Sequence, residues 1–298
     1  MNKIFRCLAI CTIGAAFTVS SIASTHPTYI QVDYPGAVTT TLNGGPNLQG
    51  TGVGTWTDSG GVVHGLTYNY NNGRFTSFDP PGSTGTTPNF ISPEGMIVGV
   101  YTDSAAVLHG FILANGHYQT VDYPGAAGTA LDGISPLGEI VGFECDDAAC
   151  THFHGFTRSV TGHFSSPFDP PGAAISEPAT VNLFGVIVGG YWTVAPPQNQ
   201  FLHGYVLYNG QYTTIDYPGT TSGTFCGGNN LWNHIVGQWV DSSGTLHSFL
   251  LKDGNYTSFD PPGTGPGGSV ATGINVFDVI VGIFADSAGN VHGYVRKP

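Results

Sequence analysis

Histidine and aspartate recur at fixed places along this chain, and both residue types bind metal ions and transfer protons in enzymes. The histidines stand before a glycine or serine and an apolar residue at His64, His109, His154, His203, His247 and His292. The aspartates stand before a Tyr-Pro-Gly or Pro-Pro-Gly turn at Asp33, Asp79, Asp122, Asp169, Asp216 and Asp260.

The even spacing of these residues favours a structural role. One aspartate falls in each repeat of 43–47 residues, and one histidine accompanies it. Equivalent side chains in a ring of repeats lie in different repeats, so they cannot converge on one metal ion. We interpret each histidine as a hydrogen-bonding residue within its own repeat. Each aspartate is interpreted as an acceptor for turn amides, beside a turn that Pro-Gly sets.

Two further segments could carry chemistry. Residues 57–61 read TDSGG, like the nucleophile segment of trypsin-like proteases, but TDSAA, VDSSG and ADSAG occupy the same slot in other repeats. Ser59 is therefore expected in a repeated hairpin turn, without a dedicated His/Asp pair. The chain has no phosphate-binding loop and no HExxH zinc motif. No catalytic residue, cofactor or metal is predicted from these motifs.

A repeat of about 45 residues is typical of a propeller or a solenoid. In residues 126–172, the segments 129–135, 139–145, 151–159 and 163–169 are β-branched and aromatic runs between turn residues. No segment beyond the N-terminal stretch keeps a helical period. Each repeat is therefore predicted to form four antiparallel strands, which is one propeller blade.

The two ends of the repeat region complement each other. The segment 29–36 has only the fourth strand of a repeat, and the segment 264–298 lacks that strand. Joining them closes a ring and removes exposed sheet edges. The sequence thus predicts an all-β, six-bladed β-propeller over residues 24–298. Its blades are expected at about 38–82, 83–125, 126–172, 173–219, 220–263, and 264–298 plus 29–36.

The repeated phrase resembles the extracellular repeats of the HAF family, named from a His-Ala-Phe motif after a glycine-rich turn. Here the motif reads HGL, HGF, HGF, HGY, HSF and HGY, with Gly or Ser in place of the usual Ala. The resemblance covers almost the whole chain after its first residues. It implies a secreted bacterial β-propeller, and it brings no catalytic residues with it.

Residues 1–23 have the features of a cleaved secretory leader. Lys3 and Arg6 precede a short apolar run, and Ser21-Ile22-Ala23 fits a cleavage site. No later segment is apolar for long enough to span a membrane. The protein is therefore expected outside the cytoplasm, either extracellular or periplasmic. After cleavage five cations face 19 acids, so nucleic acid is not an expected partner.

Three cysteines remain after the leader. Cys145 and Cys150 flank a four-residue turn between two predicted strands, where opposed residues lie within disulfide reach. A disulfide is favoured over two free thiols. A zinc site that adds His152 and His154 is the least favoured reading, because the repeat already demands a histidine at position 154. Cys226 has no evident partner and is expected to be buried.

The predicted blades sort the charges onto two rims. Six aspartates end the fourth strands, and six more lie in the turns after the second strands: Asp58, Asp103, Asp146, Asp147, Asp241 and Asp286. These turns share one rim, whereas the cations fall on the other: Arg74, Arg158, Lys252, Arg296 and Lys297. The acidic rim either attracts basic partners or reflects the preference of turns for aspartate.

The opposite rim carries large apolar residues in the turns after four consecutive first strands: Leu137, Phe184, Trp232 and Phe277. Exposed, they would form an interaction patch and allow weak self-association. Alternatively, each side chain folds back onto the neighbouring blade, and we favour this alternative slightly because propeller blades pack side by side.

Departures from the repeat indicate a specific site. The second-strand turn of the third blade holds the cysteine pair, and the fourth blade replaces its Asp-Ser turn with TVAPPQNQ. Divergent loops on a rigid scaffold often bind ligands, although drift in a tolerant loop explains them equally well. The candidate contacts are Asp146, Asp147, Trp192, Ala195, Pro196, Pro197, Gln198 and Gln200.

Three classes of function compete. The favoured one is a non-catalytic binding module for a glycan, a protein or an envelope component; the alternatives are a hydrolase or lyase with a site in the central channel and a self-associating surface protein. The positions expected to line the channel are Gly44, Asn89, Asp132, Ala179, Gly227 and Thr272. They include a single carboxylate, which favours binding over metal-dependent catalysis.

Overall fold

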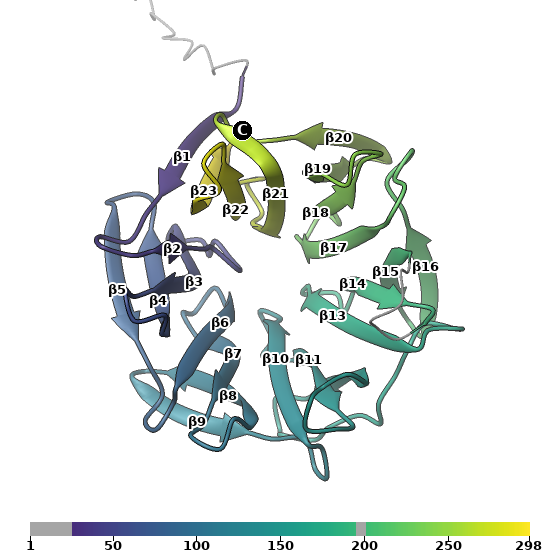
Figure 1. The fold of residues 1–298 in the computed structure, drawn as a ribbon. Coiled ribbons are helices and arrows are strands. Elements are labelled where there is room, and N and C mark those ends of the chain that lie inside the picture. The colour runs from purple at the N-terminus through teal and green to yellow at the C-terminus, as the bar shows by residue number, and fades with distance from the viewer. Residues whose placement is uncertain (1–25, 195–200) are drawn as a thin grey trace, which may run out of the picture.

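Six antiparallel sheets stand around a central axis in this protein (Figure 1). The structure is a computed structural model that describes residues 26–194 and 201–298. The sheets are the blades of a β-propeller, so the predicted fold class is confirmed. The predicted leader, residues 1–23, lies outside the described residues.

Each blade runs from an inner strand beside the axis to an outer strand at the circumference. Blades one and two are β2 (Thr39–Thr40), β3 (Thr51–Thr57), β4 (Val63–Asn69) and β5 (Arg74–Phe78), then β6 (Gly85–Ile91), β7 (Ile97–Thr102), β8 (Leu108–Ala114) and β9 (His117–Val121). Blades three and four are β10 (Gly128–Ile134), β11 (Ile140–Cys145) and β12 (Phe153–Arg158), then β13 (Ile175–Val181), β14 (Ile187–Trp192), β15 (Leu202–Tyr208) and β16 (Gln211–Ile215). Blades five and six are β17 (Thr224–Asn229), β18 (Ile235–Val240), β19 (Leu246–Lys252) and β20 (Asn255–Phe259), then β21 (Thr264–Ile274), β22 (Ile280–Asp286), β23 (Val291–Lys297) and β1 (Thr28–Val32).

The fourth segment of blade three is the least regular. It joins β12 through isolated bridges from Phe164 to Arg158 and from Phe168 to Gly155. Pro167 lies between these bridges and has no N–H to donate, so a continuous ladder cannot form there.

The ring is closed by the strand that comes first in the chain. β1 pairs antiparallel with β23, from Thr28 opposite Lys297 to Val32 opposite Gly293. Val32 and Val295 of this blade pack with Leu66 of blade one in a single buried cluster. Both ends of the described chain are therefore held in one blade and its interface with the next.

A glycine in the second strand of every blade allows the inner strand to approach closely. Gly142 of β11 is an example, because a methyl group added there would overlap the carbonyl oxygen of Ala130 on β10. The same close approach occurs at Gly54, Gly99, Gly189, Gly237 and Gly282. The repeated Ile-Val-Gly motif therefore has a steric cause.

Beside these glycines the inner strand bulges. The pairing of inner and second strands skips one residue in each of blades two to six: Asn89, Asp132, Ala179, Gly227 and Thr272. A bulge redirects the side chain of the skipped residue. All five line the central cavity, in agreement with the expected channel positions. The sixth expected position, Gly44 of blade one, is not among the lining residues, and its neighbour Asn43 is.

The cysteines follow the prediction from the sequence. Cys145 and Cys150 form a disulfide, and Cys226 is free and fully buried between blades four and five. Burial also raises the pKa of the Cys226 thiol, which keeps it in the unreactive thiol form at neutral pH.

Thiol counting tests this arrangement in a chain without residues 1–23. We expect no thiol to react in the folded protein, one to react after unfolding without reductant, and three after unfolding with reductant. Three reactive thiols in unfolded, unreduced protein would contradict the disulfide.

Candidate functional site

The repeated histidines join the turns of their own blades. His64 is an example: its Nδ1 lies 2.8 Å from Asp79 at the end of β5, and its Nε2 lies 3.6 Å from Asp58 in the turn after β3. Equivalent Nδ1–Asp pairs of 2.6–3.0 Å recur at His109, His154, His203, His247 and His292. These contacts agree with the interpretation that each repeated histidine is a hydrogen-bonding residue within its own blade.

These contacts place both sets of repeated aspartates on one rim of the ring, which we call the acidic rim. Asp58 also accepts the backbone N–H groups of Gly60 and Val62 in its own turn. The turn aspartates are therefore already engaged in their own loops. The aspartates of the acidic rim therefore stabilise the turns of their own blades and also give this rim a negative potential.

Asp146 and Asp147 of the predicted site lie on this rim, outside the central cavity. Asp146 lies 3.4 Å from Nε2 of His154. Asp147 accepts the hydroxyl and backbone N–H of Thr151, and these hydrogen bonds lower its pKa to about 2. The two side chains thus have structural partners, and the structure does not bring them together with Trp192.

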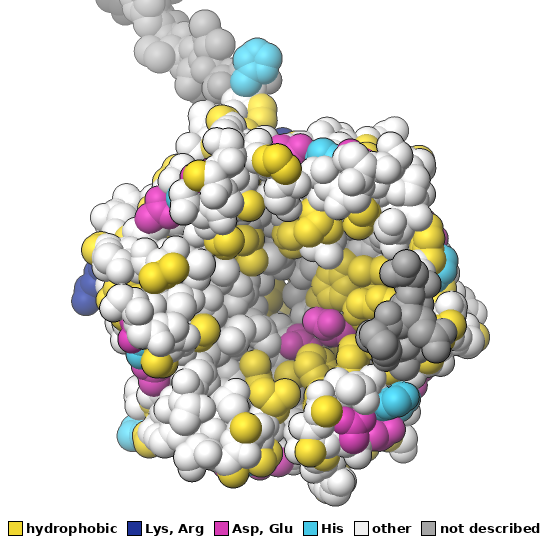
Figure 2. All heavy atoms as spheres, in the orientation of Figure 1, with side chains coloured by type: hydrophobic (Ala, Val, Ile, Leu, Met, Phe, Trp, Pro, Cys, Tyr) yellow, Lys and Arg dark blue, Asp and Glu magenta, His cyan; other side chains and the backbone are white. Residues whose placement is uncertain are grey.

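The main cavity opens along the central axis and has a volume of about 430 Å³. Figure 2 shows it as a hollow in the middle of the face, with hydrophobic side chains on one wall and acidic side chains beside them. We call it the central pocket; the lining side chains used below are Asn43, Thr87, Asn89, Asp132, Glu177, Thr180, Trp192, Phe225, Gln238 and Thr272.

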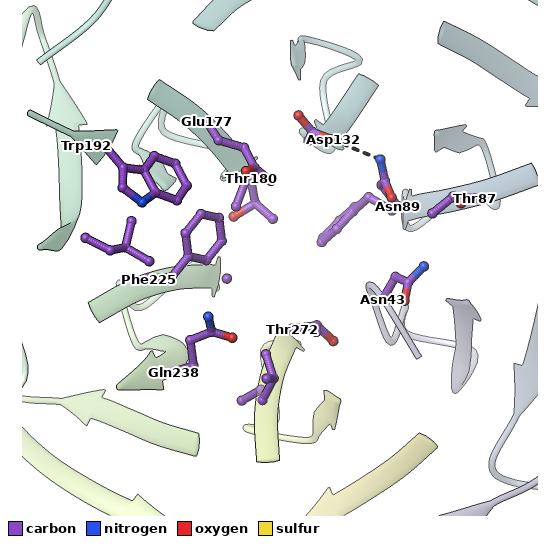
Figure 3. A pocket seen from close by; sticks show the side chains of 16 residues that line it. Asn43, Thr87, Asn89, Asp132, Glu177, Thr180, Trp192, Phe225, Gln238 and Thr272 are labelled. Atoms are coloured by element: carbon purple, nitrogen blue, oxygen red, sulfur yellow. Dashed lines mark hydrogen bonds between the residues drawn. The ribbon is translucent and has the colours of Figure 1, made fainter. Parts of the chain in front are cut away.

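The inner strands supply most of this lining at alternate positions. In β13, Ala179 is the bulge residue and Glu177 precedes it by two, so both side chains face the axis. Phe225 of β17 and Thr87 of β6 occupy the same place as Glu177 in their own blades. Figure 3 shows these side chains around the opening, with Trp192 and Phe225 next to Glu177.

The expectation of a single channel carboxylate is wrong, because Glu177 joins Asp132 in the central pocket. The sequence analysis considered one position of the inner strand. The two-residue period of a strand was the signal that could have found Glu177, since Ala179 was already assigned to the channel.

Both carboxyl groups have perturbed protonation. Asp132 is 8% exposed, and its Oδ1 accepts a hydrogen bond of 3.0 Å from Nδ2 of Asn89 (Figure 3). Burial, together with the charge of Glu177, raises the pKa of Asp132 well above its usual range. Burial raises the pKa of Glu177 to about 7. The surroundings of Asp132 therefore favour its protonated form, and Glu177 titrates near neutrality.

Trp192 is the sequence-predicted contact that lies in the central pocket. It is the last residue of β14, pairs with Leu202 of β15, and packs edge-on against Phe153. Leu202 lines the pocket next to it. The other predicted contacts of this loop, Ala195, Pro196, Pro197, Gln198 and Gln200, lie outside the described residues.

The opposite rim carries the predicted apolar residues. Leu137, Phe184, Trp232 and Phe277 are 62–69% exposed; we call them the apolar rim. In this turn the backbone N–H of Phe184 donates to Asn182 Oδ1, and the side chain projects outward. The favoured expectation that these side chains fold back onto the next blade is therefore wrong, although Trp232 Nε1 donates to Val276 of blade six.

Replacing Phe184 and Trp232 with serine tests whether the apolar rim is an interaction surface. We expect the monomer to stay folded, with a change in unfolding free energy of about 1 kcal/mol or less, because exposed side chains contribute little to packing. Sedimentation analysis should show weaker self-association than in the unchanged protein. Unfolding of the variant, or unchanged association, would contradict an interaction role.

Residues 26–194 and 201–298 contain no group of three or more His, Cys, Asp and Glu side chains placed to hold a metal ion. The same residues contain no helix that is long and apolar enough to cross a membrane.

Comparison with known proteins shows the fold but no family. No protein-family model matches the chain, and no curated protein matches it. TolB from Acinetobacter baumannii is similar, with a TM-score of 0.57 and 10% identity over 85% of this chain and 65% of TolB. The chain thus spans about two thirds of TolB.

Two fungal proteins have comparable similarity. AofleA from Arthrobotrys oligospora has a TM-score of 0.53 and 12% identity over 93% of this chain and 84% of its own. The Aleuria aurantia lectin AAL, solved with Fucα1-6GlcNAc, has a TM-score of 0.51 and 12% identity over 86% of this chain and 91% of its own. At these identities the similarity shows the propeller fold alone.

Proposed function

We propose that this protein is a non-catalytic binding module that takes a saccharide in the central pocket. The observation that carries the proposal is the division of the pocket into an aromatic wall and a polar wall. Trp192 and Phe225 form the first, the amides of Asn43 and Asn89 belong to the second, and the amide of Gln238 lies beside Phe225.

Saccharides match this division. The C–H faces of a sugar ring are apolar and pack on aromatic rings, whereas its hydroxyl groups need donors and acceptors at the edge. Amide side chains supply both kinds of group. The pocket volume of about 430 Å³ lies within the range of roughly 300–1,000 Å³ that is usual for small-molecule sites.

Two further observations support the proposal. A lectin, AAL, is among the proteins with a similar fold, which makes a sugar site compatible with this architecture. The disulfide between Cys145 and Cys150 suits an oxidising compartment. We therefore propose, with the leader-like residues 1–23 and the HAF-like repeats, that the protein is exported and meets glycans outside the cytoplasm.

Substitution of Trp192 tests the site. A glycan array identifies a saccharide, and calorimetry then measures its affinity for the unchanged protein and for Trp192→Ala. We expect Trp192→Ala to weaken binding about 10-fold or more, because a buried aromatic contact often dominates a binding site.

Trp232→Ala on the apolar rim is the matched control, since it removes the same side chain far from the pocket. We expect it to leave the affinity unchanged. Equal affinity in Trp192→Ala and the unchanged protein, or an equal loss in both variants, would contradict the site. Absence of any glycan ligand would contradict the function.

A second candidate function is hydrolysis or elimination at the same pocket. The observation that favours it is the carboxyl pair, because an acid whose pKa is raised by burial beside one that titrates near neutrality can act as general acid and general base. Release of product from the array ligand, abolished by Glu177→Gln with binding retained, would establish catalysis. Binding without turnover supports the binding module.

A further inference from the structure

Asp132 and Glu177 face the central pocket without a counter-ion. They lie on the neighbouring inner strands β10 and β13, and the charge of Glu177 raises the cost of ionising Asp132. None of the described side chains that line the pocket is a lysine, an arginine or a histidine. The negative charge that these two groups can carry is therefore balanced by no cation of the described residues around the pocket.

Asp132 also has an unused acceptor. Its Oδ1 is bound by Asn89, but its Oδ2 is buried and has no hydrogen-bond partner among the described residues. Buried polar atoms in folded proteins nearly always have a partner. An orphaned carboxyl oxygen beside a second carboxyl group indicates that a group which donates hydrogen bonds and carries positive charge belongs there.

The aromatic wall suits the same group. Trp192 and Phe225 line the cavity on the side of Glu177 (Figure 3), and the face of an aromatic ring attracts a cation. An ammonium group has three N–H donors and no acceptor, so it can bind both carboxylates and lie near an aromatic ring. A carboxylate or phosphate on the ligand would be repelled by the same pair.

We propose that the ligand of the central pocket is an amino sugar with a free amine, whose ammonium group binds between Asp132 and Glu177. The inference rests on the proposed saccharide function and names the class of saccharide. The amides and hydroxyls of the polar wall bind the ring hydroxyls, and Trp192 packs on the ring. N-acetylation of the amine removes the charge, so the acetylated sugar loses the contact that distinguishes the ligand.

A divalent cation is a poorer fit to the same residues. Calcium takes six to eight oxygen ligands, whereas the described residues place no third acidic or histidine side chain with this pair. A quaternary amine such as choline shares the positive charge but has no N–H donor for Oδ2 of Asp132 and no ring hydroxyls for the polar wall. Both are tested below as competing ligands.

Binding is coupled to protons. Glu177 is faced by Asp132 from β10 and by Tyr205 from β15, whose own pKa responds to Glu177. The ammonium group favours the ionised carboxylates, so binding releases protons when either group is protonated in the free protein. Affinity for the amino sugar is therefore expected to rise from pH 5 to pH 7, while affinity for a neutral sugar stays constant.

Calorimetry at pH 7 tests the proposal with four probes: the β-1,4-linked glucosamine disaccharide, its N-acetylated form, cellobiose and choline. We expect the glucosamine disaccharide to bind about 10-fold more tightly than the other three, with proton release detected by comparing two buffers of different ionisation enthalpy. Glu177→Gln and Asp132→Asn should reduce this preference to about 2-fold or less.

Asp147→Asn is the control, because this acid lies on the acidic rim outside the pocket and should leave the preference intact. Glu177→Gln keeps the test valid if Asp132→Asn does not fold. Equal affinity for the glucosamine disaccharide and cellobiose would overturn the inference and leave the saccharide function standing. Choline binding as tight as that of the amino sugar, or stoichiometric Ca²⁺ binding lost in Glu177→Gln, would also overturn it. Binding of none of the sugars would overturn the proposed function as well.

Discussion

Replacing Gly142 with alanine is expected to destabilise the propeller by about 3 kcal/mol, among the largest effects of a single methyl group in this chain. Gly142 has ordinary backbone angles, so the cost comes from space: the new methyl group would overlap the carbonyl oxygen of Ala130. Relief requires β10 to move away from β11. Chemical denaturation measures the loss.

The same substitution should also damage the central pocket. β10 carries Asp132 at its bulge, two residues after Ala130, so displacement of this strand moves the Asp132 carboxyl group. We expect weaker ligand binding in any Gly142→Ala protein that remains folded.

Gly85→Ala is the matched control. Gly85 begins β6, and a methyl group added there meets no atom within 4 Å. Its unfolding free energy should change by about 0.5 kcal/mol or less. If Gly142→Ala and Gly85→Ala unfold at the same denaturant concentration, the close approach of the inner strand does not explain the repeated glycine.

Replacing Glu177 with glutamine is expected to stabilise the protein at pH 8 and to have little effect at pH 5. The folded-state pKa of Glu177 is about 7, above the usual value of about 4.3. Between these two values the folded state holds a proton that the unfolded state has released. Stability is therefore highest at low pH and falls as pH rises through the folded-state pKa.

The expected loss in the unchanged protein is about 1–3 kcal/mol between pH 5 and pH 8, since one unit of pKa shift corresponds to about 1.4 kcal/mol and Glu177 keeps some contact with solvent. Glutamine has nearly the same shape and cannot ionise, so the variant avoids this loss. Denaturation of both proteins at pH 5 and pH 8 measures the difference.

The histidines also change the stability of the protein in this pH range. The effect of Glu177 must therefore be measured as the difference between the unchanged protein and Glu177→Gln. The hydrogen bond to Asp79 raises the pKa of His64, so its stabilising contribution is also lost as pH rises. This contribution is common to both proteins and cancels. Glu94→Gln, which neutralises an exposed acid on the opposite rim, should behave like the unchanged protein. Parallel pH profiles for the unchanged protein and Glu177→Gln would show that Glu177 ionises freely in the folded state.

The two predictions concern one feature, a pocket whose residues are held by a rigid scaffold at some cost in stability. The glycine permits the bulge that directs Asp132 to the axis, and the propeller then buries Asp132 beside Glu177. A buried carboxyl pair without a counter-ion destabilises the free protein. Proteins commonly keep such destabilising residues at binding sites, where function requires them.

The residues of the repeat predicted the architecture because repetition encodes it directly. The evenly spaced Asp33 to Asp260 indicated six equivalent units, and the unmatched fourth strand at residues 29–36 indicated how the ring closes. Local turn chemistry and strand period were enough for these inferences. The disulfide could likewise be predicted, because Cys145 and Cys150 face each other across a short turn.

The pocket depended on contacts that local patterns do not contain. Glu177 and Asp132 are separated by a full blade in the chain, and their pKa values depend on how deeply the closed ring buries them together. The exposure of Phe184 likewise depends on how the blades pack in space, and the expectation that neighbouring blades cover such side chains had suggested the opposite.

The sequence by itself determined the number of blades, the closure of the ring, the disulfide and the bulge residues that face the axis, because each follows from short-range spacing repeated along the chain. Only the tertiary structure decided that two carboxyl groups meet an aromatic wall in one cavity. The reason is that burial and charge interaction depend on distances through space between blades, which no spacing along a single strand specifies.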